Sequence, residues 1–489
     1  MLFNSVFFIA IFLPISLFVY FYFAKISARY AIYSLIALSL IFYGWHTPVN
    51  LLLIGFSLGV NYLLLSIIVR QQKKSGLVFG VLFNLLVLSY FKYANFFIDT
   101  TNHLLQLNFK FMEVVLPLAI SFFTFQMIAF LVDVYRKQVS LPAFPDYCAF
   151  ILFFPQLIAG PILRHSDFLP QFANPSIYRP NSANLAIGST IFIIGLFKKT
   201  ILADSFAPIS DMIFKFSQEG NIPSLPEAWL GIMAFSLQIY FDFSGYSDMA
   251  IGLARMFNFK FPINFNSPYK ATSIIDFWRR WHISLSFLLR DYLYFPLGGN
   301  RKGPFRRHLN LLITMLIGGL WHGASWTFVV WGGLHGLYLT INHLARSVFI
   351  QSTTPLLLKR MATFLIVSLT WVFFRAESFR SAALFFAGLT GKGGTHLRIH
   401  QCTIETKLYF SEVALGLMVC FFLPTIYEWM IRYQPALNNG SLWKDPPSYV
   451  RRKGFLWRPT WIYLAITLII LFIAFGNIEH AQEFLYFQF

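Results

Sequence analysis

A histidine inside an apolar stretch is the most informative feature of this 489-residue chain. It is His322, in the segment GLWHGASW at 319–326. An ionisable side chain at the depth of a bilayer costs free energy, so a functional role is the first hypothesis for it. An imidazole exchanges a proton near neutral pH, which suits acid–base chemistry. We therefore predict that chemistry takes place at His322.

A second group of polar residues lies in 267–303, around the sequence FWRRWH. Arginine is suited to bidentate contact with phosphate oxygens, so Arg279 and Arg280 are candidates for binding an anionic donor molecule. In that interpretation His282 faces a polar tunnel. The segment equally fits an amphipathic interfacial helix whose cations lie among lipid headgroups, and both interpretations stay open.

Five polar residues interrupt a third apolar stretch, QIYFDFSGYSDMAIG at 238–252. They are Gln238, Asp242, Ser244, Tyr246 and Asp248. Five such groups cannot all face lipid, so they either join neighbouring helices by hydrogen bonds or line the cavity that His322 faces. Our candidate tunnel-lining residues are Gln238, Asp242, Tyr246, Asp248 and Trp321.

Other groups offer weaker signals. His335 follows His322 by 13 residues, which rotates it by about 220° around a continuous helix, so we expect it to be a hydrogen-bonded structural histidine. No acidic or thiol ligand lies in the same short segment, so no metal site is predicted. The three cysteines have neither metal-ligand spacing nor an obvious pairing, and cysteine chemistry is not expected.

The composition indicates the class of protein that positions these residues. The chain is 57% hydrophobic and 19% aromatic but only 12% charged, which predicts an all-α polytopic membrane protein. Its net charge of +18 gathers in short loops, as expected on the cytoplasmic side, where it also attracts anionic donors. The first apolar run, 6–24, lacks the flanking features of a cleaved signal peptide and is predicted to be a retained span.

Apolar runs long enough to cross a bilayer recur along the chain. They lie near 6–24, 30–45, 50–69, 77–98, 114–134, 184–203, 229–254, 324–345, 361–374, 411–431 and 460–476, with a shorter run at 309–322. Together they predict about 12 transmembrane helices with both termini outside the cytoplasm.

Three segments depart from this simple pattern. Pro155, Gly160 and Pro161 interrupt 146–165, and the amphipathic 274–297 lies between two basic loops. We predict that both segments are re-entrant or interfacial. In 184–203, Lys198 and Lys199 contradict the orientation that the other basic clusters predict, and the sequence does not resolve that conflict.

Several motifs in order identify a family resemblance. They are FFPQLIAGPILRHSDFLPQF, QIYFDFSGYSDMAIGLARMFNF, PINFNSPYKATSIIDFWRRWHISLSFLLRDYLYFPLGGN and GLWHGASWTFVVWGGLHG. With these motifs the chain resembles the membrane-bound O-acyltransferase family, and within it the bacterial branch that acetylates alginate. The resemblance implies one membrane domain, 1–489, around a central tunnel. Its parts would be peripheral helices at 1–140, a catalytic core at 145–345, and C-terminal helices with an external tail at 356–489.

The resemblance also implies an activity. A cytoplasmic acyl thioester, acetyl-CoA in the first instance, would supply an acetyl group that crosses the inner membrane to an exported polysaccharide, without a bound cofactor or metal. His322 matches the principal histidine of the family and would be the general base for a hydroxyl. His282 matches the second histidine and would orient the thioester or stabilise the oxyanion. Which of the two takes the proton stays open.

The expected partners follow from the same resemblance. They are the lipid bilayer, the thioester donor, and an extracytoplasmic polysaccharide acetyltransferase resembling SGNH hydrolases; no nucleic acid is expected.

The chain ends in EFLYFQF, which resembles the FxYxxF ending of bacterial relatives, with Phe484, Tyr486 and Phe489 at the three fixed positions. In this interpretation Tyr486 is a phenolic acyl carrier. Two simpler interpretations stay open: Tyr486 belongs to an aromatic membrane belt, or the ending is a remnant of a protease-recognition tag.

Three other functions compete with polysaccharide acetylation. Peptidoglycan O-acetylation and teichoic-acid D-alanylation are alternatives within the same enzyme class. A transporter or export channel without covalent chemistry would also explain many spans with polar residues inside them.

Overall fold

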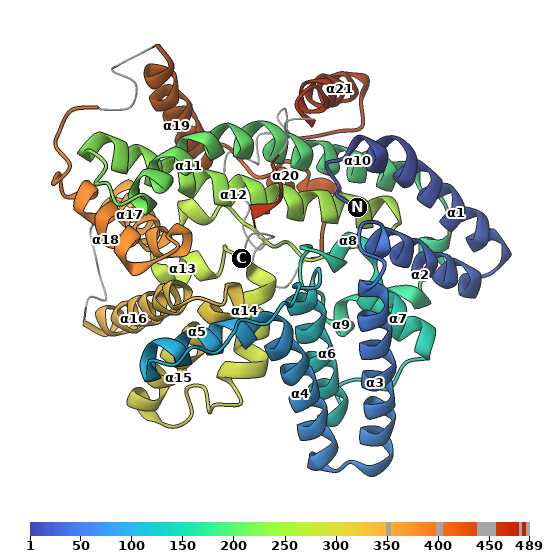
Figure 1. Cartoon of the computed structure of the whole chain (residues 1–489). Coiled ribbons are helices and arrows are strands. Elements are labelled where there is room, and N and C mark those ends of the chain that lie inside the picture. The colour runs from blue at the N-terminus through green and yellow to red at the C-terminus, as the bar shows by residue number, and fades with distance from the viewer. Residues whose placement is uncertain (349–353, 398–403, 438–455, 479–481, 486–489) are drawn as a thin grey trace. The chain divides into compact units, whose positions relative to one another are not determined.

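The computed structural model describes residues 1–348, 354–397, 404–437, 456–478 and 482–485, and in these ranges the protein is built from helices (Figure 1). Within the same ranges, extended pairing is limited to one bridge between Pro262 and Leu437. The predicted all-α class is confirmed.

The helices belong to two compact units, each assembled from separate stretches of the chain. Unit 1 comprises Met1–Ile193, Tyr246–Ile263 and Met430–Ile469. Unit 2 comprises Ile194–Gly245, Asn264–Trp429 and Ile470–Phe489. The division into peripheral helices, core and C-terminal helices stays a prediction.

Unit 1 contains most of the amino-terminal helices. They are α1 (Leu13–Ile26), α2 (Ala28–Gly44), α3 (Asn50–Gln71), α4 (Lys74–Leu88), α5 (Ala94–Leu105), α6 (Ile120–Tyr135), α7 (Phe144–Leu152), α8 (Phe154–Leu157) and α9 (His165–Phe168). Phenylalanine rings fill its interior, where Phe8 packs within 6.2 Å of Phe3, Phe42 and Phe154 between ring centroids. The segment 146–165 is broken into short helices, since α7 ends at Leu152 and α8 begins at Phe154 with Pro155 in its first turn. Its re-entrant or interfacial position stays a prediction.

Unit 2 contains the segments that carry the predicted chemistry. Its helices are α11 (Asp204–Gln218), α13 (Ile274–Trp278), α14 (Ile283–Leu289), α15 (Gly303–His322), α16 (Trp326–Val348), α17 (Leu356–Arg375), α18 (Phe379–Leu389), α19 (Ile404–Phe422) and α20 (Ile426–Trp429). Three further helices have residues in both units: α10 (Ser182–Phe197), α12 (Leu225–Met256) and α21 (Trp461–Phe475).

Among the described residues of unit 2, α15 and α16 make the most extensive helix contact, and the two lie side by side (Figure 1). Glycine makes this approach possible. A Cβ at Gly319 would collide with the carbonyl oxygen of Phe328, and a Cβ at Gly332 would collide with that of Met315. Small residues that let helix backbones approach are typical of membrane helix pairs.

Five described helices are long and apolar enough to cross a bilayer. They are Phe8–Ile26, Asn50–Gln71, Lys74–Leu105, Ser182–Gln218 and Leu356–Arg375. Shorter apolar helices accompany them at Ala28–Gly44, Ile120–Tyr135, Phe379–Leu389, Leu408–Phe422 and Trp461–Phe475. The protein is therefore polytopic, and the number of about 12 crossings stays a prediction.

The helix predicted at 184–203 is longer than expected. It continues through a π-helical segment, Lys198–Ala203, into α11. The residues of α11 are amphipathic rather than uniformly apolar, so they were not part of the predicted apolar run. Lys199 is only 3% exposed and lies between two carboxylates. A buried lysine that is paired with carboxylates does not mark a cytoplasmic loop. Lys199 therefore does not contradict the predicted orientation of this helix.

Candidate functional site

His322 is the last residue of α15 and is 4% exposed. Aromatic rings surround its imidazole: the ring centroids of Trp321, Trp331 and Phe374 lie at 5.0, 5.1 and 5.4 Å. The chain leaves the helix at Gly323, where a side chain would collide with the ring of Phe328. The tight end of α15 thus places His322 inside an aromatic enclosure.

His282 lies between α13 and α14 and is fully buried. Its backbone is left-handed, with φ at 41°, a conformation that costs a non-glycine residue about 1–3 kcal/mol. Its ring and that of Phe243 are nearly perpendicular, with 4.7 Å between the centroids, and its centroid lies 6.5 Å from that of His322. Unit 2 therefore brings the two predicted histidines together, although they lie on different elements.

The two nitrogens of His282 have different surroundings. Nδ1 lies 3.2 Å from Oδ1 of Asn264. Nε2 is buried and meets no hydrogen-bond partner among the described residues. Burial lowers the pKa of His282, which lies outside the candidate spans, to about 3, so its imidazole is neutral at pH 7.

His335 has both nitrogens occupied. Trp278 Nε1, which can only donate, gives a hydrogen bond to Nδ1 at 3.2 Å. Nε2 must then carry the hydrogen, and it donates to Thr370 Oγ1 at 3.0 Å. The predicted hydrogen bonding of His335 is confirmed, and its structural role stays a prediction.

The two arginines of the FWRRWH motif differ in their surroundings. Arg280 Nε pairs with Asp276 at 2.8 Å, and its Nη1 donates to the backbone oxygen of Asn266. Arg280 therefore holds the turn that precedes His282. Arg279 is exposed. Donor binding by either arginine stays a prediction, with Arg279 the more accessible of the two.

The candidate tunnel-lining residues fall into two groups. Gln238, Asp242 and Trp321 belong to unit 2 and are buried, and the ring of Trp321 lies 6.1 Å from His282 and 5.0 Å from His322. Tyr246 and Asp248 are buried in unit 1, where Tyr246 stacks on Phe3. Their relation to the histidines stays a prediction.

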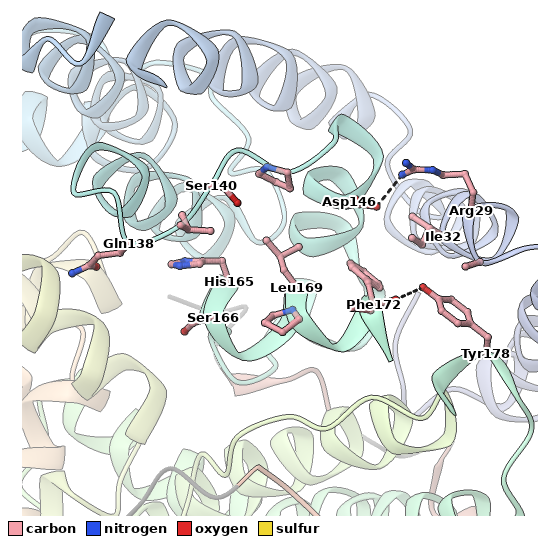
Figure 2. Close-up of a pocket in the computed structure, with 15 residues that line it drawn as sticks. Arg29, Ile32, Gln138, Ser140, Asp146, His165, Ser166, Leu169, Phe172 and Tyr178 are labelled. Atoms are coloured by element: carbon pink, nitrogen blue, oxygen red, sulfur yellow. Dashed lines mark hydrogen bonds and ion pairs between the residues drawn. The ribbon is translucent and has the colours of Figure 1, made fainter. Parts of the chain in front are cut away.

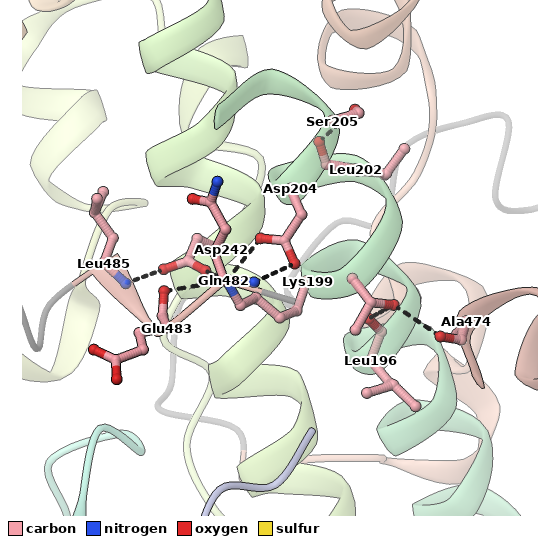
Figure 3. Close-up of polar contacts among 11 residues, drawn as sticks. Leu196, Lys199, Leu202, Asp204, Ser205, Asp242, Ala474, Gln482, Glu483 and Leu485 are labelled. Atoms are coloured by element: carbon pink, nitrogen blue, oxygen red, sulfur yellow. Dashed lines mark hydrogen bonds and ion pairs between the residues drawn. The ribbon is translucent and has the colours of Figure 1, made fainter. Parts of the chain in front are cut away.

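Asp242 belongs to a cluster of charges that the sequence did not reveal. We call Lys199, Asp204 and Asp242 the acidic clasp. Lys199 Nζ lies 2.8 Å from Asp204 Oδ1 and 2.7 Å from Asp242 Oδ1 (Figure 3). One ammonium group therefore lies between two carboxyl groups in a buried position. The signal that could have found it was a lysine inside an apolar run, which requires a charged partner.

The remaining carboxylate oxygens of the acidic clasp bind the C-terminal segment 482–485. The backbone N–H of Gln482 donates to Asp204 Oδ2 at 3.3 Å, and that of Leu485 donates to Asp242 Oδ2 at 2.9 Å (Figure 3). Lys199 Nζ also donates to the backbone oxygen of Glu483. The clasp therefore holds this segment through its backbone.

The same segment reaches the histidine site. Phe484 is 2% exposed and packs on Phe243, with 5.7 Å between the ring centroids. Phe243 is the ring that meets His282. Tyr486 and Phe489 lie outside the described residues, so the predicted carrier tyrosine is not tested.

Unit 1 has a separate pocket of about 810 Å³ (Figure 2). Its wall includes His165, whose Nδ1 lies 3.2 Å from Asp133 Oδ2, and an ion pair of 3.1 Å between Arg29 and Asp146. Burial lowers the pKa of His165 to about 4. None of the predicted site residues lines this pocket.

Metal ligands do not gather anywhere in the described ranges: no group of three or more His, Cys, Asp or Glu side chains is placed to hold an ion. The histidine pair consists of two buried imidazoles, a group that can take part in proton transfer, and the acidic clasp binds a peptide backbone.

Comparison with known proteins identifies the class. Residues 77–384 match the model of the membrane-bound O-acyltransferase family, a range that includes both histidines. The chain belongs to this family and is an O-acyltransferase, as the motifs predicted.

Relatives of several kinds are similar to the chain. It is 42% identical to a peptidoglycan O-acetyltransferase of Helicobacter pylori over 81% of each chain. It is 36% identical to a probable alginate O-acetylase of Pseudomonas aeruginosa over 100% of each chain. A teichoic acid D-alanyltransferase of Streptococcus thermophilus is 30% identical over 46% of this chain and 56% of its own length.

Proposed function

We propose that this membrane enzyme transfers an acetyl group from cytoplasmic acetyl-CoA to an exported polysaccharide of the alginate kind, and that it lies in the bacterial inner membrane. Full-length similarity to probable alginate O-acetylases supports the substrate class. The observation that carries the chemistry is the pair of buried imidazoles, His282 and His322, with centroids 6.5 Å apart.

The proposed reaction is attack of a hydroxyl oxygen on the thioester carbon. A hydroxyl is a weak nucleophile, so His322 takes its proton as the C–O bond forms. The C–S bond then breaks, and the leaving thiolate receives the proton from His322. The products are an acetyl ester and the free thiol, and the aromatic enclosure limits competing attack by water.

Two further parts of the enzyme complete the proposal. Arg279, with its exposed side chain, contacts phosphates of the donor. Tyr486 accepts the acetyl group on its phenolic oxygen and passes it to an extracytoplasmic partner resembling SGNH hydrolases, which esterifies the glycan. The acidic clasp supports this role because it binds the four described residues that precede Tyr486 in the chain.

Peptidoglycan O-acetylation is the second candidate, and the 42% identity to the Helicobacter pylori protein favours it. The proposed chemistry is the same, and only the final glycan differs. Ester analysis of the exopolysaccharide and of the cell wall, in cells with and without the gene, separates the two. D-alanylation is less well supported, because those relatives match less than half of the chain.

The decisive experiment uses purified protein in lipid nanodiscs with acetyl-labelled acetyl-CoA. We expect wild-type protein to consume the thioester and His322→Ala to lose this activity while it remains monodisperse. His103→Ala, at an exposed histidine of α5, is the matched control and should behave as wild type. Full activity of His322→Ala would exclude the proposed base, and an intact donor with wild-type protein would favour a transporter.

A further inference from the structure

The side chain of Asn264 has a defined orientation next to the histidine pair. Its Oδ1 atom lies 3.3 Å from the backbone nitrogen of Ser284 and 2.9 Å from the hydroxyl of the same residue. A backbone N–H can only donate a hydrogen bond, so the atom that it meets must be the amide oxygen rather than the amide nitrogen. This contact removes the usual uncertainty between the two ends of an asparagine side chain.

The orientation of Asn264 determines which nitrogen of His282 carries the hydrogen. Nδ1 of His282 lies 3.2 Å from that same oxygen, and a carbonyl oxygen can only accept. The hydroxyl of Ser284 also lies 3.5 Å from Nδ1, but it gives its hydrogen to the closer Oδ1 of Asn264 at 2.9 Å, so Nδ1 is the donor to Asn264. A neutral imidazole has one N–H, so Nε2 carries a lone pair.

The other nitrogen of the His282 ring, Nε2, makes no such contact. Nε2 is buried and meets no hydrogen-bond partner in the described part of the chain, and a buried polar atom without a partner costs about 1–3 kcal/mol. The left-handed backbone at His282 adds a further cost. Such costs are typical of positions where a substrate group supplies the missing contact.

We propose that Asn264 is a positioning residue, which fixes His282 in the Nδ1–H tautomer so that Nε2 accepts a hydrogen bond from a donor group of the substrate. This inference rests on the proposed function. The sequence left two roles open for His282, which were to orient the thioester or to stabilise the oxyanion. A lone pair on Nε2 repels an oxyanion, so the inference excludes the second role. His282 thus accepts a hydrogen bond from the substrate and orients it, and it is the proposed function that assigns proton transfer to His322.

The inference has a direct test that does not depend on turnover. In protein labelled with 15N-histidine, the nitrogen chemical shifts of a neutral imidazole separate the two tautomers. The signals of His282 are those that disappear in His282→Gln. We expect a protonated Nδ1 and an unprotonated Nε2 in wild-type protein. The opposite tautomer would overturn the inference, whatever the enzyme transfers.

Two substitutions at Asn264 test the consequence for catalysis. Asn264→Leu has a similar volume but no acceptor, so kcat/KM should fall by about tenfold or more. Asn264→Asp keeps the acceptor oxygen, so it should fix the same tautomer and retain more activity than Asn264→Leu. Equal losses in the two variants would contradict a positioning role.

The aspartate variant has a second expected signature in its pH profile. A carboxylate at position 264 stabilises the imidazolium form of His282, which has no free acceptor nitrogen. The acid limb of the pH–rate profile should therefore move to higher pH than in wild-type protein. His322 is the titratable group packed against His282; its other ring neighbours, Phe243, Phe265 and Trp321, do not titrate. An unmoved acid limb would count against the inference.

A matched control separates this effect from the general cost of altering a buried asparagine. Asn310, on α15, is also fully buried, and its side chain donates to the backbone oxygen of Gly299. Asn310→Leu should lower stability without changing the tautomer of His282 or the pH profile. If all variants lack acetyl transfer but the expected tautomer is observed, the proposed function fails and the positioning by Asn264 stands.

Discussion

Replacing Lys199 by Met tests the acidic clasp, because it removes one charge and nearly preserves the length of the side chain. The substitution leaves the carboxylates of Asp204 and Asp242 buried without their cation. Removing one partner of a buried ion pair costs about 3–5 kcal/mol. The high burial of the cluster, with side chains 3% exposed for Lys199 and Asp242 and 11% for Asp204, places this change in the upper part of that range.

The size of the effect can be checked by combining substitutions. A loss of about 3–5 kcal/mol raises the equilibrium constant for unfolding by more than about a hundredfold. The triple variant Lys199→Met, Asp204→Asn, Asp242→Asn has no buried charge left in the cluster. It should recover most of the loss, since an ion pair and neutral groups of similar size often have comparable stability. Lys198→Met, at the neighbouring and partly exposed lysine, is the matched control.

Two measurements report the effect of changing the acidic clasp. Denaturant titration of the protein in micelles, monitored by tryptophan fluorescence, gives the free energy of unfolding. Carboxypeptidase digestion with intact-mass detection reports whether 482–485 has been released, and we expect faster digestion in Lys199→Met. A Lys199→Met protein within about 0.5 kcal/mol of wild type, with unchanged digestion, would refute the argument that Lys199 neutralises the clasp and holds the tail.

Three further substitutions address the other site residues. Tyr486→Phe should abolish onward transfer to the glycan while thioester binding persists, and mass spectrometry that finds no acetylated C-terminal peptide in wild-type protein would argue against the carrier. Arg279→Ala should weaken donor binding in a salt-dependent manner by titration calorimetry, whereas Arg280→Ala, which breaks the pair with Asp276, should mainly lower thermal stability. His335→Leu should cost about 1–3 kcal/mol, because Trp278 Nε1 loses its acceptor and Thr370 Oγ1 loses the hydrogen bond that it accepts, with unchanged kcat per folded molecule. A large change in kcat would contradict a structural role.

The sequence predicted the helical class from its apolar composition and its long apolar runs. An imidazole or a carboxylate in an apolar run is expensive, so His322 and Asp242 attracted attention without knowledge of the fold, and the polar FWRRWH segment drew attention to His282. Their predicted roles still await the experiments above. The adjacency of the two histidines was not predictable from spacing, because the left-handed turn at His282 changes the direction of the chain between two short helices.

Other features depended on contacts between distant parts of the chain. Asn264 looks like an ordinary polar loop residue in the sequence, and only the hydrogen bonds of Ser284 and His282 reveal its function. The sequence alone suggested that Lys199 marks a cytoplasmic loop. Its partners were not evident, because Asp242 lies on α12 and Asp204 lies beyond the predicted end of the helix that carries Lys199. Local patterns predict that a buried charge needs a partner but do not predict which residue supplies it.

The glycine contact between α15 and α16 also bears on how sequence changes will affect this enzyme. His322 ends one helix and Trp331, which packs against its imidazole, belongs to the other, so the spacing of the two backbones sets the position of the ring. A methyl group at 319 or 332 would widen that spacing and displace the imidazole by a fraction of an ångström, leaving the rest of the bundle in place. Changes at these glycines would thus lower the activity as a change of His322 would, although a glycine has no side chain to take part in the chemistry.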